Sequence, residues 1–178
     1  MSSIQTSLSD TLNRNLLFVH GKGGVGKTVI SQAIARHFSQ TGAKVLWITI
    51  EDPTLSAGDL VEVSHSLWHL NCSFKPAFEE YMAMKVGALS RLFLKNRLIF
   101  QMANVAPGIH ELVLLGKIWF ERLRYSHVIV DLPSTGYGLA LFQSTENFTQ
   151  LFQTGPLHRD ATPIDNLRRT GRLLPVRL

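Results

Sequence analysis

The clearest chemistry in this sequence lies in eight consecutive residues, Gly21 to Thr28, which read GKGGVGKT. They match the full pattern GxxxxGK followed by Ser or Thr. Glycines let the backbone wrap closely around a chain of phosphates and turn successive N–H groups toward it. A lysine at this place reaches the terminal phosphates, and the hydroxyl that follows it binds Mg²⁺. The pattern predicts a phosphate-binding loop formed by Gly21, Lys22, Gly23, Gly24, Val25, Gly26, Lys27 and Thr28.

Such a loop needs a strand before it and a helix after it, and the sequence predicts both. Residues 16–19 are a short apolar run typical of a buried parallel strand. Apolar residues then recur at helical spacing from 29 to 38, and Gly42 marks the end of that helix. Residues 45–50 predict a second strand, which completes a right-handed βαβ unit. This context favours phosphate binding over a glycine-rich turn without a ligand.

The rest of the chain predicts one α/β domain. Helical patterns dominate from about 76 to 124, and a third apolar strand follows at 127–130 and ends in Asp131. Three strong strands are fewer than the ~5–6 of an ordinary sheet of this class. We expect a P-loop NTPase fold, in which a mostly parallel sheet is flanked by helices, with a helical insert between strands and an incomplete sheet.

The predicted organisation has three parts. They are a polar N-terminal segment at 1–15, the P-loop domain at 16–165 with its insert at about 76–124, and a basic tail at 166–178. Gly171 and Pro175 interrupt any helix in the tail, so we expect it to be loose. The small number of strands favours an N-terminal portion of a larger nucleotide-binding domain, truncated at its C-terminal side.

Charge and composition narrow the function classes. Four of the five net positive charges lie in the tail, so the sequence makes no strong case for nucleic acid or a membrane surface. The single cysteine, Cys72, excludes a disulfide framework and a CxxC zinc site. No apolar run approaches the ~18 residues that span a bilayer, and the polar first residues are not a signal peptide. We expect a cytoplasmic protein.

The string GKGGVGKT resembles the deviant Walker-A ATPases, a class that includes arsenite-pump ATPases, tail-anchored-protein targeting factors, MinD and ParA proteins and nitrogenase iron protein. The resemblance implies binding of ATP with Mg²⁺. It also implies that Lys22 reaches across a dimer interface to the partner's nucleotide, and hence a nucleotide-dependent homodimer. The alternative for Lys22 is a solvated loop lysine.

Asp131 has the setting of a carboxylate that organises Mg²⁺ together with Thr28, because it ends a buried strand. A strand-end aspartate can also cap a turn or a helix. The residues after it, 131–139, resemble the D-x-x-x-T-G-H switch of the arsenite-pump and targeting-factor branch. Segment 51–53 resembles the switch of that branch in which an aspartate, here Asp52, positions or deprotonates the attacking water. Segments 106–111 and 155–157 are also similar to that branch.

The sequence departs from this family at several places. Tyr137 stands where the switch has histidine, and Thr54-Leu55-Ser56 replaces alanine, histidine and asparagine. The segments that grip adenine, the arsenite-binding cysteines and the zinc-binding CxxC are absent from the sequence given. These departures bear on how the switches communicate, on the nucleotide base and on the client.

Our leading hypothesis is a Mg-ATP hydrolase of the arsenite-pump and targeting-factor type, with Lys22, Lys27 and Asp52 as catalytic residues and Thr28 and Asp131 at the metal. A protein client is a possible partner. One alternative is a ParA- or MinD-like positioning ATPase. The other is a truncated pseudo-enzyme that binds nucleotide without hydrolysis.

Overall fold

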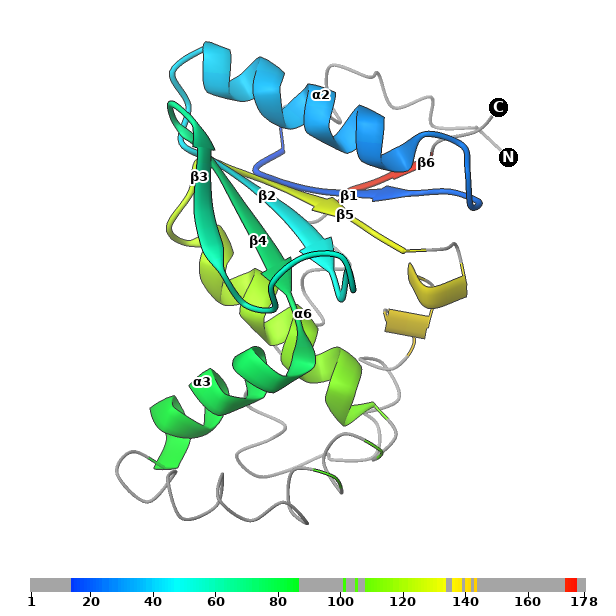
Figure 1. Ribbon diagram of the computed structural model, residues 1–178, viewed down its shortest axis with the longest axis vertical. Helices are drawn as coiled ribbons and strands as arrows, with labels where there is room; N and C mark the ends of the chain where they lie inside the picture. The colour runs from blue at the N-terminus through cyan, green and yellow to red at the C-terminus, as the bar shows by residue number, and fades with distance from the viewer. Residues whose placement is uncertain are drawn as a thin grey trace, which may run out of the picture.

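A six-stranded sheet lies at the centre of the part of the chain that a computed structural model describes, residues 14–86, 101, 105, 108–133, 136–138, 140, 141, 143 and 172–175 (Figure 1). Its strand order is β3-β4-β2-β5-β1-β6. In chain order the elements are β1 (Leu16–His20), α2 (Lys27–Gln40), β2 (Val45–Ile50), β3 (Leu60–Ser64), β4 (Leu67–Cys72), α3 (Phe74–Val86), α6 (Ile109–Arg122), β5 (His127–Asp131) and β6 (Arg172–Pro175).

The sheet is parallel except at one edge. β1 pairs with β5 and β6, and β2 pairs with β4 and β5, all in parallel, whereas β3 runs antiparallel to β4. Because the parallel strands all point the same way, the residues that follow β1, β2 and β5 meet at the carboxyl ends of these strands. Open α/β sheets bind their ligands at the carboxyl ends of the strands.

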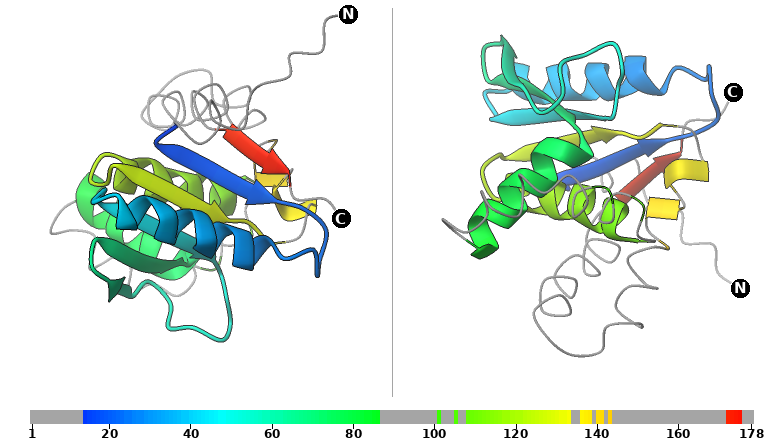
Figure 2. Two further views of the ribbon diagram at one scale, coloured as in Figure 1. Left: turned by 90° about the horizontal axis from the view of Figure 1, so that it is seen from above. Right: turned by 60° about the horizontal axis from the view of Figure 1, so that its bottom comes forward.

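Helices cover both faces of the sheet (Figures 1 and 2). Side chains alternate along each strand, so β1 sends Leu17 and Val19 into the core below α2, and Leu16 and Phe18 into the core on the α6 side. These residues are almost completely buried. The two cores hold β1, and therefore the loop that follows it, in a fixed position.

Helix α2 lies on the sheet through small side chains. Its buried residues are Ser31, Ala35 and Ser39, whereas Val29 is 70% exposed. Ile34 and Phe38 flank the contact and are partly buried. Small side chains let the helix approach the sheet closely, which keeps the first turn of α2 near the ends of β2 and β5.

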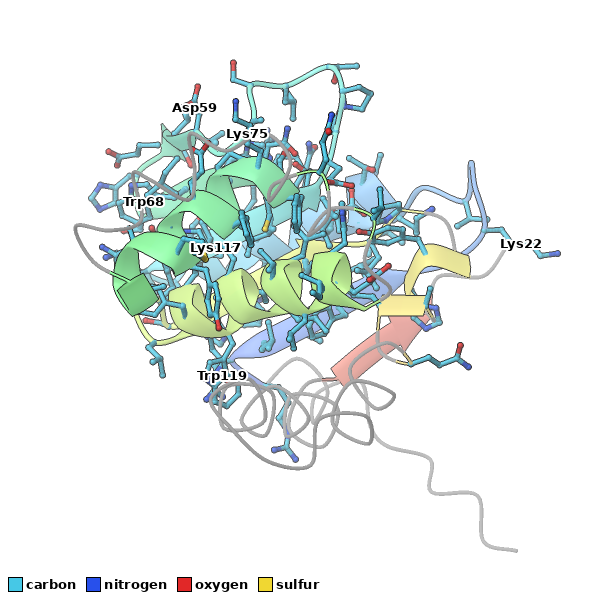
Figure 3. The ribbon with its side chains drawn as sticks, turned by 90° about the horizontal axis from the view of Figure 1, so that it is seen from below. Lys22, Asp59, Trp68, Lys75, Lys117 and Trp119 are labelled. Carbon is cyan, nitrogen blue, oxygen red and sulfur yellow. The ribbon has the colours of Figure 1, made fainter. Side chains whose placement is uncertain are left out.

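Helices α3 and α6 pack against each other beyond the sheet. Lys117 of α6 lies between them, with Nζ 2.6 Å from Oε2 of Glu80 and 2.7 Å from Oε1 of Glu121 (Figure 3). A small apolar cluster of Phe74, Phe78 and Val113 reinforces this contact. None of the helices among the described residues is long and apolar enough to cross a membrane.

The structure confirms the predicted α/β class, the three predicted strands and the helix after the loop, which Gly42 terminates with φ 86°. It also has three strands that the sequence did not predict: β3, β4 and β6. The prediction that the tail is loose is wrong for Arg172–Pro175, which forms β6 and pairs in parallel with β1. Residues 1–13, 87–100 and 144–171 lie outside the described residues, so the domain limits at 15 and 165 stay predictions.

Candidate functional site

The loop between β1 and α2 has the backbone that its glycines were expected to allow. Gly24 and Gly26 have φ values of 78° and 84°, a region that residues with side chains rarely adopt. An added Cβ would meet nothing within 4 Å at either position. Gly26 is the N-cap of α2 and offers no side-chain acceptor, so the first N–H groups of the helix are available to an anion.

The two lysines of this loop have different surroundings. Lys27 lies in the first turn of α2, and its Nζ donates a hydrogen bond to the carbonyl oxygen of Lys22 at 3.0 Å. The side chain of Lys22 is exposed and extends outward from the tip of the loop (Figure 3). Lys27 is therefore held against its own loop, whereas Lys22 points away from the molecule.

A cleft of about 550 Å³ opens at the carboxyl ends of β1, β2 and β5. Five of the expected site residues line it together: Gly23, Lys27, Thr28, Asp52 and Asp131. Lys22, Gly21, Gly24, Val25 and Gly26 belong to the same loop but do not line the cleft. The lining also includes Glu51, Pro53 and Tyr137.

Asp131 is the buried acid of this cleft. The residue is 7% exposed, and its Oδ1 atom has no hydrogen-bond partner among the described residues. Burial raises the pKa of its carboxyl above the ordinary value of 3.8, although the Thr28 hydroxyl and the Lys27 ammonium act in the opposite direction. A buried acid with an unsatisfied oxygen favours a cation beside it.

Asp52 follows β2 and is held by its own turn. Its Oδ1 accepts hydrogen bonds from the backbone N–H of Thr54 at 2.9 Å and from the Thr54 hydroxyl at 2.6 Å. These bonds lower the pKa of the Asp52 carboxyl. The carboxylate is thus a weak base and a good hydrogen-bond acceptor.

The sequence analysis missed the residues that hold this turn. Asn71 of β4 is 1% exposed, and its amide accepts from the N–H of Asp52 at 3.0 Å and donates to the C=O of Asp52 at 2.9 Å. Thr49 of β2 lies opposite Asn71 in the sheet register. The only signal for Asn71 was a polar residue in a segment that also contains His69 among apolar residues, and β4 itself was not predicted.

The second switch is only partly described. Ser134 and Thr135 lie outside the described residues, as do the predicted similarities at Ala106, Pro107 and 155–157. Tyr137 lines the cleft and packs against the core on the α6 side. Its hydroxyl is buried, without a hydrogen-bond partner in the described structure, and burial raises its pKa.

A comparison with known protein families finds a match over most of the chain. Residues 14–167 match the family described as anion-transporting ATPases. The match includes the loop, both aspartates and the two helices beyond the sheet.

Individual relatives are similar at a lower level. ATPase BagA of Mycobacterium tuberculosis is 27% identical, over 88% of this chain and 53% of its own length. A protein of Aquifex aeolicus provisionally named arsenical pump-driving ATPase 2 is 27% identical, over 74% of this chain and 50% of its own. An ATPase ASNA1 homolog of Plasmodium yoelii yoelii is 28% identical, over 75% of this chain and 37% of its own. The chain thus spans about half, or less, of the length of these relatives.

Proposed function

From the premise that this chain belongs to the anion-transporting ATPase family, we propose that its cleft binds ATP with Mg²⁺ and supports hydrolysis of the terminal phosphate. One observation carries the proposal: Lys27, Thr28, Asp52 and Asp131, from three separate segments, line the same cleft. A phosphate-binding lysine, a hydroxyl, a water-orienting acid and a metal-organising acid are the groups that this reaction requires.

The residues present fit a magnesium ion. Mg²⁺ prefers oxygen ligands and keeps several waters, so one hydroxyl and one carboxylate are sufficient protein groups. Thr28 would contribute its hydroxyl, and Asp131 would organise the ion directly or through water with its unsatisfied Oδ1. When bound, the ion supplies positive charge beside the phosphates, which offsets the charge that develops on them.

Lys27 and the loop backbone would hold the phosphates. The ammonium group of Lys27 is bonded to the carbonyl of Lys22, at a position exposed to solvent. Exchange of that neutral acceptor for a phosphate oxygen gives a bond between two opposite charges, which is stronger. The N–H groups at the start of α2 add further donors toward the same ligand.

Asp52 would orient the attacking water and would not remove its proton. Its lowered pKa makes the carboxylate a poor general base at neutral pH. As an acceptor, it fixes one O–H of the water, so that a lone pair of the water oxygen faces the phosphorus. The proton would leave later, to the phosphate itself or to solvent.

Lys22 supports the proposed homodimer. Its side chain extends away from its own cleft (Figure 3), so a phosphate that it contacts would have to belong to another molecule. A second copy of this chain, with its cleft facing the first, would bring Lys22 to the partner's nucleotide. The dimer, the cytoplasmic location and a protein client remain parts of the proposal.

Binding without hydrolysis is the second candidate. Tyr137 stands in the cleft where the resembling switch has histidine, and its buried hydroxyl has no partner among the described residues. A phenol does not change its charge near neutral pH as a histidine does. In this second candidate, the phosphate loop binds the nucleotide but the switch does not respond to it.

Steady-state ATP hydrolysis with Mg²⁺ separates the two candidates. The parent is compared with Lys27→Ala and Asp52→Asn, with Lys75→Ala and Asp59→Asn as matched controls outside the cleft (Figure 3). Turnover that both site variants lose and both controls keep is the expected result. A folded parent that binds MgATP but releases no phosphate would leave the nucleotide-binding candidate standing and end the hydrolysis proposal.

A further inference from the structure

The side chain of Asn71 is the main polar anchor of the segment that carries Asp52. Its amide joins both backbone groups of Asp52, and Nδ2 also donates to the C=O of Leu55 at 3.2 Å. The backbone carbonyl of Asn71 accepts from the N–H of Gly58 at 2.9 Å. One residue of β4 therefore contacts the loop after β2 at three points.

Apolar packing cannot replace these bonds. Residues 53–57 are all exposed, so little of the loop is buried against the core. Loss of the Asn71 side chain would leave the N–H of Asp52 without its partner, and would leave the C=O of Asp52 with the N–H of Leu55, 3.3 Å away, in place of two donors. Because buried polar groups must find new partners or water, the loop would have to move.

A second layer of side chains orients the Asn71 amide. The Thr49 hydroxyl donates to Oδ1 of Asn71 at 3.4 Å and lies 3.0 Å from Nε2 of His69. A hydroxyl has one proton, so a bond to Asn71 requires that His69 donates from Nε2. The direction His69 to Thr49 to Asn71 fixes which end of the amide faces Thr49, and hence places Nδ2 on the loop carbonyls.

We propose that Asn71 is a positioning residue, which fixes the backbone of Asp52 so that its carboxylate stays in the cleft. The inference rests on the proposed function insofar as it concerns turnover. Asn71 does not line the cleft, so it acts through Asp52 and not on the nucleotide.

The test uses Asn71→Leu, which keeps the size of the side chain and removes its hydrogen bonds. Cys72→Ala is the matched control: it is the next residue of β4, equally buried, and faces the opposite side of the sheet. Three quantities are measured for the parent and both variants: kcat for ATP hydrolysis, Kd for MgATP, and amide hydrogen exchange of residues 51–59.

We expect Asn71→Leu to lower kcat about tenfold or more, and to leave Kd within about threefold of the parent. Exchange in residues 51–59 should become about tenfold faster. Cys72→Ala should change none of the three by as much. Unchanged kcat and exchange in folded Asn71→Leu would overturn the proposal, as would a loss of MgATP binding in proportion to the loss of kcat.

The exchange measurement separates this proposal from the proposed function. If the parent hydrolyses nothing, the hydrolysis proposal fails, and faster exchange in Asn71→Leu alone still establishes that Asn71 holds Asp52. If Asn71→Leu does not fold, Thr49→Val replaces it, because that variant removes the hydroxyl that orients the amide. Because Thr49 itself lines the cleft, the readout for this variant is the exchange of residues 51–59, which should become about threefold faster, and exchange equal to that of the parent would overturn the inference.

Discussion

Glu51 and His110 form an ion pair, with Oε1 of Glu51 3.1 Å from Nε2 of His110. The pair joins the loop that carries Asp52 to the first turn of α6. The same Glu51 oxygen accepts the N–H of Phe74 at the start of α3, and the His110 ring stacks on Phe74. Glu51 itself has a φ of 49°, a strained conformation for a residue with a side chain. The cleft and the helices beyond the sheet are thus linked through one residue next to Asp52.

This ion pair predicts a defined pH dependence of stability. The hydrogen bond to His110 lowers the pKa of Glu51 from 4.5, and the bond to Glu51 raises the pKa of His110 from 6.5. Glu51, whose pKa is lowered, contributes stability above pH 4.5 that is lost at lower pH. His110, whose pKa is raised, contributes stability below pH 6.5 that is lost as the pH rises through the pKa of His110 in the folded protein. The contribution of the pair to stability is therefore largest between pH 4.5 and pH 6.5.

Urea unfolding of the parent and His110→Gln at pH 5.5 and pH 8.5 checks this prediction. The free energy of unfolding that the variant loses relative to the parent should be about 0.5 to 1 kcal/mol larger at pH 5.5 than at pH 8.5, which is the range for a partly exposed ion pair. His65→Gln, at an exposed position, is the control. An equal loss at both pH values would mean that the pair contributes no charge interaction.

Asp131→Asn should stabilise the protein without nucleotide. Burial raises the pKa of this acid, so the folded state binds the proton more tightly than the unfolded state does. The contribution of Asp131 to stability therefore falls as the pH rises above 3.8. Removal of its charge should raise the free energy of unfolding by about 1 kcal/mol at neutral pH. The stabilisation that MgATP gives the parent should disappear in the variant. Thermal unfolding with and without MgATP measures both effects, and Asp59→Asn should show neither.

Lys117→Met should weaken the contact between α3 and α6. Lys117 is bonded to Glu80 and to Glu121, whose side chain is only 3% exposed. Without Lys117, the one ion-pair partner that the described part of the chain leaves to the buried carboxylate of Glu121 is Arg124, whose Nη1 lies 3.5 Å away. We expect a loss of about 3 kcal/mol in the free energy of unfolding. The double variant Lys117→Met, Glu121→Leu should recover part of it, and no recovery would contradict this explanation.

Lys22→Ala should act on assembly and leave the fold unchanged. The side chain is exposed, so its removal should change the free energy of unfolding by less than about 0.5 kcal/mol. Sedimentation velocity of the parent should show a larger species with MgATP, and Lys22→Ala should stay at the smaller mass. Lys75→Ala should behave as the parent does. A larger species that forms equally in Lys22→Ala would remove Lys22 from the proposed interface.

The sequence predicted the elements whose signals are local. The apolar runs of β1, β2 and β5 and the glycine pattern of the loop are consequences of burial and of backbone freedom, which appear directly in residue types. The strands that were missed lack such signals. All five residues of β3 are exposed, β4 contains His69 and Asn71 among apolar residues, and β6 lies among arginines.

The site was predicted where it depends on motifs and missed where it depends on pairing between strands. Lys27, Thr28, Asp52 and Asp131 were identified from their positions after predicted strands, and the structure brings them to one cleft. Asn71 and His110 were not identified as parts of the site. Their contacts join residues 19 and 59 positions apart, and spacing along the chain cannot predict such contacts.

Calorimetric titration of ATP into the chain, with Mg²⁺ and with EDTA, tests most directly whether this cleft is a nucleotide site. The parent should bind ATP with Mg²⁺ and bind it more weakly in EDTA. Lys27→Ala should lose at least about tenfold in affinity, as expected for a lost charge-assisted bond, whereas Lys75→Ala should match the parent. Equal affinity in the parent and Lys27→Ala, or no binding by a folded parent, would contradict the account.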